Sequence, residues 1–351
     1  MELHVALQKN FGAFSLDVAF TVQGERIGVF GPSGSGKSTL ASLLAGLQQP
    51  DSGIIRLDGE VLYDKSGATN VPPELRRIGI VFQHPYLFPH MSVKGNLLYG
   101  YNRSAPANRK INFDSLVAVL QIGHLLQRGV HNLSGGEKQR VAIGRTILSS
   151  PRLLLMDEPL SALDDTLKFQ IIDYLKAASE AFRIPYLFIS HSLLEMRIMA
   201  DRVLAVGAGR IEAQTTAEDL ARSRMGLSPV GYINLLRLAH PRRVDGMSAY
   251  AWGGTELLIS AGCDHPESLF ELSSKDIILI KQHPDAISAR NLLDCTVSGT
   301  FRSGNKIGVE LACGEGRLVA EVVQEAAREL GIEKGSRLFA AIKASAFRRL
   351  G

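Results

Sequence analysis

Short apolar runs recur through the first half of the chain. They read ERIGVF, RIGIVF, RLLLM and PYLFIS, and they are followed by Gly31, Gln83, Asp157 and His191. Between the runs, apolar residues follow helical spacing over residues 36–46, 114–127, 135–149 and 166–182. Continuous apolar runs are typical of strands buried on both faces, and the longer segments are typical of amphipathic helices.

Strands that alternate with helices predict an α/β fold, with a mainly parallel sheet covered on both faces. In such sheets, ligands gather at the carboxyl ends of the strands. We therefore expect Gly31, Gln83, Asp157 and His191 to surround one crevice.

The pattern changes in the last third of the chain. AEDLARSR indicates a last helix capped by Thr216, and GLSPVG (226–231) indicates a linker. Short alternating runs follow, from AYAWGGTELLIS to RLFAAIKAS, and predict a small, OB-like β-barrel domain. The expected divisions are residues 1–228, a linker and accessory β region at 229–287, and a terminal barrel domain at 288–351.

Composition supports a globular chain of two or three domains, with 351 residues of which 45% are hydrophobic and 21% charged. No apolar run reaches the roughly 18 residues of a membrane span, and the first ten residues lack a signal-peptide pattern, so we expect a cytosolic protein. A net charge of +4 is too small to indicate nucleic-acid binding. Cys263, Cys295 and Cys313 lack metal-ligand spacing, and we expect reduced, mostly buried thiols. Trp252, the sole tryptophan, is expected to pack in a core.

The segment GPSGSGKST fits the phosphate-binding pattern G-x-x-x-x-G-K-[ST] between a strand and a helix. Glycines leave backbone N–H groups open to phosphate, the helix N-terminus adds partial positive charge, and Lys37 adds a full one. Ser38 would hold Mg²⁺ through its hydroxyl. An ordinary glycine-rich turn is the alternative. The predicted ATP-binding residues here are Gly31, Pro32, Ser33, Gly34, Ser35, Gly36, Lys37, Ser38 and Thr39.

Two adjacent carboxylates follow the third apolar run. Asp157 is placed to hold Mg²⁺, and Glu158 to polarise an attacking water. Neighbouring side chains of a strand point to opposite sides, so two roles are natural. An acidic turn before Pro159 is the structural alternative.

NLSGGEKQRV (132–141) contains a helix start. Ser134 and Glu137 form the capping-box pattern S-x-x-E. Gly135 and Gly136 weaken the first turn of that helix, which indicates that something must approach its bare N–H groups. A second anion site is therefore expected there, although Ser134 would also serve as a simple cap.

LSGGEKQRVAIGR (133–145) resembles the signature of ATP-binding cassette ATPases. The resemblance implies a cassette with a helical subdomain, and two copies closed head-to-tail around two ATP molecules, each signature contacting the partner's nucleotide through Ser134, Gly135 and Gly136. It also implies roles for four other residues. Gln83 would sense Mg²⁺ and the attacking water, Asp164 would cross to the partner, His191 would touch the γ-phosphate, and Phe11, rather than Phe14, would stack on adenine.

HPYLFPHMSVKGNLLYG (84–100) resembles the segment by which importer cassettes grip a membrane subunit. A buried loop is the alternative for its apolar run. The resemblance implies two integral-membrane permeases, an indirect periplasmic or extracellular oxyanion-binding protein, and a peripheral place on the cytoplasmic face of the plasma membrane.

SARNLLDCTVSG and GIEKGSRLFAAIKASAF are similar to the molybdate-binding mop domain. An oxyanion such as molybdate or tungstate offers only acceptors, so it needs donors and positive charge. The residues that meet this need are Ser288, Arg290, Asn291, Lys343 and Ser345. A barrel that serves only as a dimer contact is the alternative.

The whole chain resembles the ATPase subunits of molybdate importers. Three other interpretations stay open: a sulfate or other anion importer, a soluble cassette acting on DNA or ribosomes, and an oxyanion sensor with a subordinate ATPase. Coiled-coil inserts or a second cassette would favour the soluble class, and neither is present in the sequence.

Overall fold

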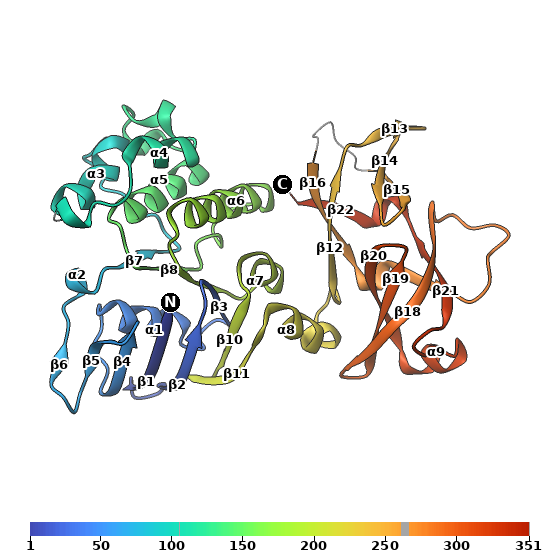
Figure 1. Ribbon diagram of the computed structural model, residues 1–351, viewed down its shortest axis with the longest axis horizontal. Helices are drawn as coiled ribbons and strands as arrows, with labels where there is room; N and C mark the ends of the chain where they lie inside the picture. The colour runs from blue at the N-terminus through green and yellow to red at the C-terminus, as the bar shows by residue number, and fades with distance from the viewer. Residues whose placement is uncertain (105, 261–266, 351) are drawn as a thin grey trace. The chain divides into compact units, whose positions relative to one another are not determined.

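The computed structural model describes residues 1–104, 106–260 and 267–350. It divides into two compact units, Met1–Ala217 and Glu218–Gly351 (Figure 1). The division precedes the expected boundary at residue 228. Among the helices of the described segments, none is long and apolar enough to cross a membrane.

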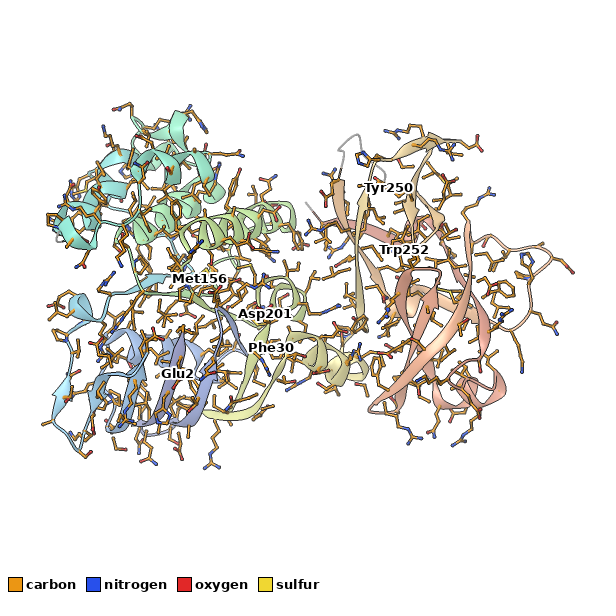
Figure 2. All side chains as sticks on the ribbon, in the orientation of Figure 1. Glu2, Phe30, Met156, Asp201, Tyr250 and Trp252 are labelled. Carbon is orange, nitrogen blue, oxygen red and sulfur yellow. A yellow bond between two sulfur atoms is a disulfide. The ribbon has the colours of Figure 1, made fainter. Side chains whose placement is uncertain are left out.

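A six-stranded sheet forms the centre of the first unit. Its order is β11-β10-β3-β9-β8-β7, and all neighbours are parallel except β10 and β11. This confirms the predicted mainly parallel sheet. Phe30 and Met156, near the ends of β3 and β8, are buried close to the middle of this unit (Figure 2). The strands are β3 (Arg26–Phe30), β7 (Ile78–Val81), β8 (Leu153–Asp157), β9 (Tyr186–Ser190), β10 (Arg202–Gly207) and β11 (Arg210–Thr216).

The unit also contains an antiparallel sheet, which the sequence analysis did not predict. Its strands are β1 (Glu2–Asn10), β2 (Ser15–Gln23), β4 (Ser52–Leu57), β5 (Glu60–Asp64) and β6 (Thr69–Asn70), in the order β2-β1-β4-β5-β6. Buried and exposed side chains alternate along β2, as expected for a sheet with one wet face. Both sheets share one core with helix α1 (Lys37–Ala45).

Helices α3 to α5 gather into a helical part of the unit, with α6 beside them (Figure 1). The predicted segment 114–127 ends early, because Gln121 adopts a left-handed φ of 52° that interrupts the helix. The helices are α2 (Pro73–Arg76), α3 (Val93–Arg103), α4 (Phe113–Val119), α5 (Gly135–Leu148), α6 (Asp165–Phe182) and α7 (Leu193–Met199).

The second unit contains a five-stranded sheet in the order β17-β21-β18-β19-β20, whose edge strands β17 and β20 approach each other in a curled half-barrel. Two three-stranded sheets, β12-β16-β22 and β13-β14-β15, complete it. The elements are α8 (Ala217–Arg224), β12 (Ile233–Ala239), β13 (Arg242–Val244), β14 (Met247–Trp252), β15 (Thr255–Ile259), β16 (Glu267–Ser273), β17 (Ile277–Ile280), β18 (Asn291–Ser303), β19 (Lys306–Cys313), β20 (Gly316–Val323), α9 (Gln324–Glu329), β21 (Arg337–Ile342) and β22 (Phe347–Leu350).

One hydrophobic core crosses the boundary that the sequence placed after residue 287. It joins Leu236 and Phe270 with Val309 and Phe347. The expected linker 226–231 also begins inside this unit, because the N–H of Gly226 donates to the hydroxyl of Ser303 at 2.8 Å. A Cβ at Gly226 would lie 2.1 Å from the Ser303 carbonyl oxygen, so the segment is tightly packed.

Trp252 and two cysteines lie in this unit (Figure 2 labels Trp252). The tryptophan packs partly buried against the core and over Gly316, as expected. Cys295 and Cys313 are buried, but the expectation of reduced thiols is wrong for them, because the structure joins them in a disulfide. Antiparallel pairing of β18 with β19 brings these distant positions together. Cys263 lies outside the described residues.

Candidate active site

The glycine-rich loop 31–36 joins β3 to α1 and has backbone that other residues would not tolerate. Gly34 and Gly36 have φ of 78° and 102°, in the left-handed region that favours glycine. A Cβ at Gly31 would lie 2.1 Å from the carbonyl oxygen of Val206. Pro32 and Ser33 are exposed on the rim, and Thr39 is half-buried in the first turn of α1. The loop thus forms a cradle of bare backbone.

Lys37 begins α1 at the base of this cradle. Its side chain is only 4% exposed, and its ammonium donates to the carbonyl oxygens of Gly31 (2.9 Å) and Pro32 (2.8 Å). Nearby, the buried hydroxyl of Ser35 has no hydrogen-bond partner among the described residues. A buried cation, an unsatisfied hydroxyl and open N–H groups fit a phosphate-bearing ligand.

Ser38 and Asp157, two of the three residues expected to hold Mg²⁺, lie side by side. The Ser38 hydroxyl donates to Asp157 Oδ1 at 3.0 Å. Burial raises the pKa of Asp157, and the hydrogen bond from Ser38 opposes this rise. Paired hydroxyl and carboxylate oxygens suit Mg²⁺, a hard cation that prefers oxygen ligands. Gln83, the third predicted metal residue, is exposed two residues beyond the end of β7.

Glu158 lies between two nitrogen groups. Its Oε1 atom is 3.6 Å from Lys37 Nζ and 3.4 Å from His191 Nδ1. Its φ is 45°, a strained value for a residue other than glycine, and its N–H donates to the Ile189 carbonyl at 3.1 Å. The carboxylate thus lies beside the first residue of α1 and the residue that follows β9.

The signature segment starts α5 with the predicted capping box. Glu137 N–H donates to Ser134 Oγ (3.3 Å), and Ser134 N–H donates to Glu137 Oε2 (2.7 Å). A Cβ at Gly135 or Gly136 would meet leucine side chains at 3.5 and 3.4 Å, which is ordinary contact. Among the residues that the structure describes, nothing near these positions therefore requires glycine.

Asp164 and Phe11 occupy exposed places at element ends. Asp164 caps α6, accepting from Leu167 N–H at 3.0 Å, a local role that the sequence analysis missed. Phe11 is 47% exposed in the turn between β1 and β2. Phe14 instead packs partly buried against the core and behind Gly36. Of the two rings, Phe11 is thus the one open to a ligand.

The segment after Gln83 is held by two side chains that the sequence analysis did not single out. The guanidinium of Arg145, in α5, donates to the carbonyls of Tyr86 (2.9 Å) and Pro85 (3.1 Å). Asn96 is fully buried and both donates to and accepts from the backbone of Phe88. Tyr86 itself is 64% exposed with a left-handed φ of 43°, so the apolar run is not a buried loop at this residue.

The predicted oxyanion residues lie in two chain segments that register brings together. Asn291 starts β18 opposite Ile342, the end of β21, so residues 288–290 and 343–345 extend from the same end of this strand pair. The predicted residues that are exposed there are Ser288, Arg290, Lys343 and Ser345.

Asn291 differs from the expectation of a free donor. Its side chain is 2% exposed and accepts from Leu258 N–H while donating to the carbonyls of Leu258 and Ile342. The amide therefore joins strands, because a buried polar group must satisfy its hydrogen bonds within the fold.

Two family models match the chain: "ABC transporter" over residues 16–161 and "TOBE domain" over residues 287–347. Curated relatives match nearly the full length. The protein named "Molybdenum import ATP-binding protein ModC" of Rhizobium etli is 36% identical over 98% of both chains. Its namesake of Mannheimia succiniciproducens is 38% identical over 98% of this chain and 99% of the relative.

Solved structures match part of the chain. cbiO1 from Clostridium perfringens, part of the ABC transporter complex cbiONQ, is 29% identical with a TM-score of 0.53 and covers 62% of this chain and 89% of its own. A second ATP-binding cassette of an ABC transporter is 28% identical with a TM-score of 0.54, covering 64% and 95%. Together with the phosphate cradle and the carboxylates beside it, these matches place the chain in the ABC transporter family, as an ATP-hydrolysing ATP-binding protein with a C-terminal TOBE domain.

Proposed function

We propose that this chain is the ATP-hydrolysing subunit of a molybdate importer. One observation carries the hydrolytic part: the Glu158 carboxylate lies 3.6 Å from Lys37 Nζ and 3.4 Å from His191 Nδ1. The substrate follows from relatives that are named for molybdenum import and match nearly the whole chain.

The loop residues and Lys37 bind the phosphates of ATP, and Phe11 stacks on the adenine. Ser38, Asp157 and Gln83 would hold Mg²⁺, which would neutralise negative charge on the phosphates. Glu158 accepts a proton from the attacking water, and His191 contacts the γ-phosphate. Lys37 and the bare N–H groups of the loop stabilise the charge that develops as the phosphoryl group transfers.

Two copies act together. Gly135 and Gly136 cost helix stability, yet a Cβ at either would meet only ordinary contacts with the rest of the described chain. A nucleotide bound to a second copy explains glycine here, since bare N–H groups at a helix start bind phosphate. Ser134, Gly135 and Gly136 therefore face the partner's ATP, and Asp164 lies at the same interface.

Residues 84–100 dock on the membrane subunits. Tyr86 is exposed, while Arg145 and Asn96 hydrogen-bond the backbone around it, so an aromatic side chain is presented on a hydrogen-bonded support. Two permease subunits place the protein on the cytoplasmic face of the inner membrane, and an extracytoplasmic oxyanion-binding protein acts indirectly through them.

A second function, oxyanion sensing, is supported by the exposed groups at the ends of β18 and β21. Arg290 and Lys343 supply positive charge, and Ser288 and Ser345 supply hydroxyl donors for molybdate or tungstate. Asn291 shapes the site as a strand connector, given its buried amide. Binding there would report the cytosolic oxyanion level to the cassettes.

Uptake in cells tests the transport function. Cells whose own copy is replaced by the Glu158→Gln variant should stop accumulating molybdate and keep taking up sulfate. Loss of sulfate uptake with normal molybdate uptake would reject the proposed substrate.

A further inference from the structure

The segment SHSLLE (190–195) contains polar side chains around His191 that the proposed function leaves without a role. Ser190 ends β9 and is 3% exposed, and Glu195 in the first turn of α7 is 9% exposed. The His191 side chain is 57% exposed. An exposed ring gains little from packing, so its position depends on the backbone that carries it.

Three hydrogen bonds close a ring around this turn. Ser192 N–H donates to Ser190 Oγ at 3.0 Å, and Ser190 in turn donates to Glu195 Oε2 at 2.5 Å. Glu195 N–H donates back to Ser192 Oγ at 3.3 Å. His191 is the residue between the two serines, so its backbone is fixed on both sides.

The helix that carries Glu195 is itself anchored. Met196 is fully buried, and a Cβ at Gly28 of β3 would lie 2.5 Å from its sulfur atom. Burial raises the pKa of Glu195, and the Ser190 hydrogen bond opposes this rise. A buried carboxylate without a donor is costly, so the Ser190 hydroxyl and the carboxylate hold each other.

We infer that Ser190 and Glu195 are positioning residues that keep the His191 ring beside Glu158. This inference rests on the proposed role of His191. Both residues act through the turn rather than on ATP, because the ring they form encloses only the strand end and the first turn of α7. A displacement of about 1 Å at a reacting group can cost up to about 100-fold in rate.

Steady-state ATP hydrolysis by the full chain tests the inference. Ser190→Ala and Glu195→Ala should lower kcat about tenfold, with KM for ATP within about twofold because the loop and Lys37 are intact. Glu195→Gln keeps an acceptor oxygen and should stay within about threefold of the wild type. In a His191→Ala background, Glu195→Ala should change kcat by less than about twofold, since both act through one group.

Ser179→Ala is the matched control. It removes a hydroxyl that donates to the Ile184 carbonyl at 2.7 Å. This hydrogen bond lies just before the first residue of β9, at the end of the strand away from His191, so the variant should leave kcat unchanged. Two results would overturn the inference but not the proposed role of His191. One is a loss of kcat from Glu195→Ala that is equally large with His191 present and in the His191→Ala background. The other is a loss of kcat in Glu195→Gln as large as in Glu195→Ala. Wild-type kcat in His191→Ala would overturn the proposed role of His191 and the inference with it. If Glu195→Ala does not fold, the same kcat measurements are made with Ser190→Ala.

Discussion

His191 Nδ1 lies 3.4 Å from Glu158 Oε1, so the neighbouring strands β8 and β9 bring a carboxylate and an imidazole to one place. The two residues are 33 positions apart in sequence (191 − 158). Parallel pairing makes them neighbours, because the carboxyl ends of parallel strands meet at the same edge.

Glu158→Gln should keep ATP affinity and lower turnover by about 100-fold or more, because the amide cannot accept the proton of water. Binding of a fluorescent ATP analogue and release of phosphate measure the two effects. Glu74→Gln, an exposed change on α2, should alter neither. Turnover near the wild-type value in Glu158→Gln would show that another group acts as the base.

Gly135→Ala should raise or preserve the melting temperature and abolish ATP-dependent dimerisation. Alanine is favoured over glycine in a helix by up to about 1 kcal/mol, and its methyl group would meet Leu163 at an acceptable 3.5 Å. The added methyl would, however, obstruct a nucleotide bound to the partner. Analytical ultracentrifugation with ATP, in the Glu158→Gln background, measures the dimer.

Gly144→Ala provides the contrast for that experiment. A Cβ there would lie 2.8 Å from Leu97, so this variant should lose stability. A Gly135→Ala protein that still dimerises with ATP would contradict the proposed two-copy site.

Stability at acidic pH should depend on Glu137. The backbone N–H of Ser134 holds the pKa of this carboxyl below its usual range. A depressed pKa means that the carboxylate stabilises the fold above its unfolded pKa of about 4.3, and that this contribution is lost as pH falls through the folded value. The difference in melting temperature between wild type and Glu137→Gln should therefore shrink as pH is lowered below about 4. A difference independent of pH would contradict the capping-box account.

Calorimetry on the purified chain should detect binding of molybdate and tungstate and weaker binding of sulfate. Lys343→Ala should reduce the affinity at least about tenfold, because it removes a positive charge from the proposed oxyanion site. Lys334→Ala, an exposed change after α9, is the control. If Lys343→Ala and Lys334→Ala bind the oxyanion with equal affinity, the oxyanion binds elsewhere. If no heat of binding is detected, the TOBE domain serves only as a dimer scaffold.

The sequence determined the elements whose signals are local. Apolar runs marked β3, β7, β8 and β9, the glycine and lysine pattern marked the loop before α1, and S-x-x-E marked the start of α5. Such signals are readable because strand burial, helix capping and backbone freedom each depend on a few neighbouring residues.

Only the tertiary structure decided which distant groups meet. Register made Asn291 a buried strand connector rather than a free donor, and brought Cys295 to Cys313. Packing assigned the 226–231 segment to the second unit. It also brought the Arg145 guanidinium within hydrogen-bonding distance of the Tyr86 carbonyl, and the Glu195 carboxylate within hydrogen-bonding distance of the Ser190 hydroxyl. These relationships depend on strand pairing and helix packing over long separations in sequence, where the energy of each contact is set by burial that no local pattern encodes.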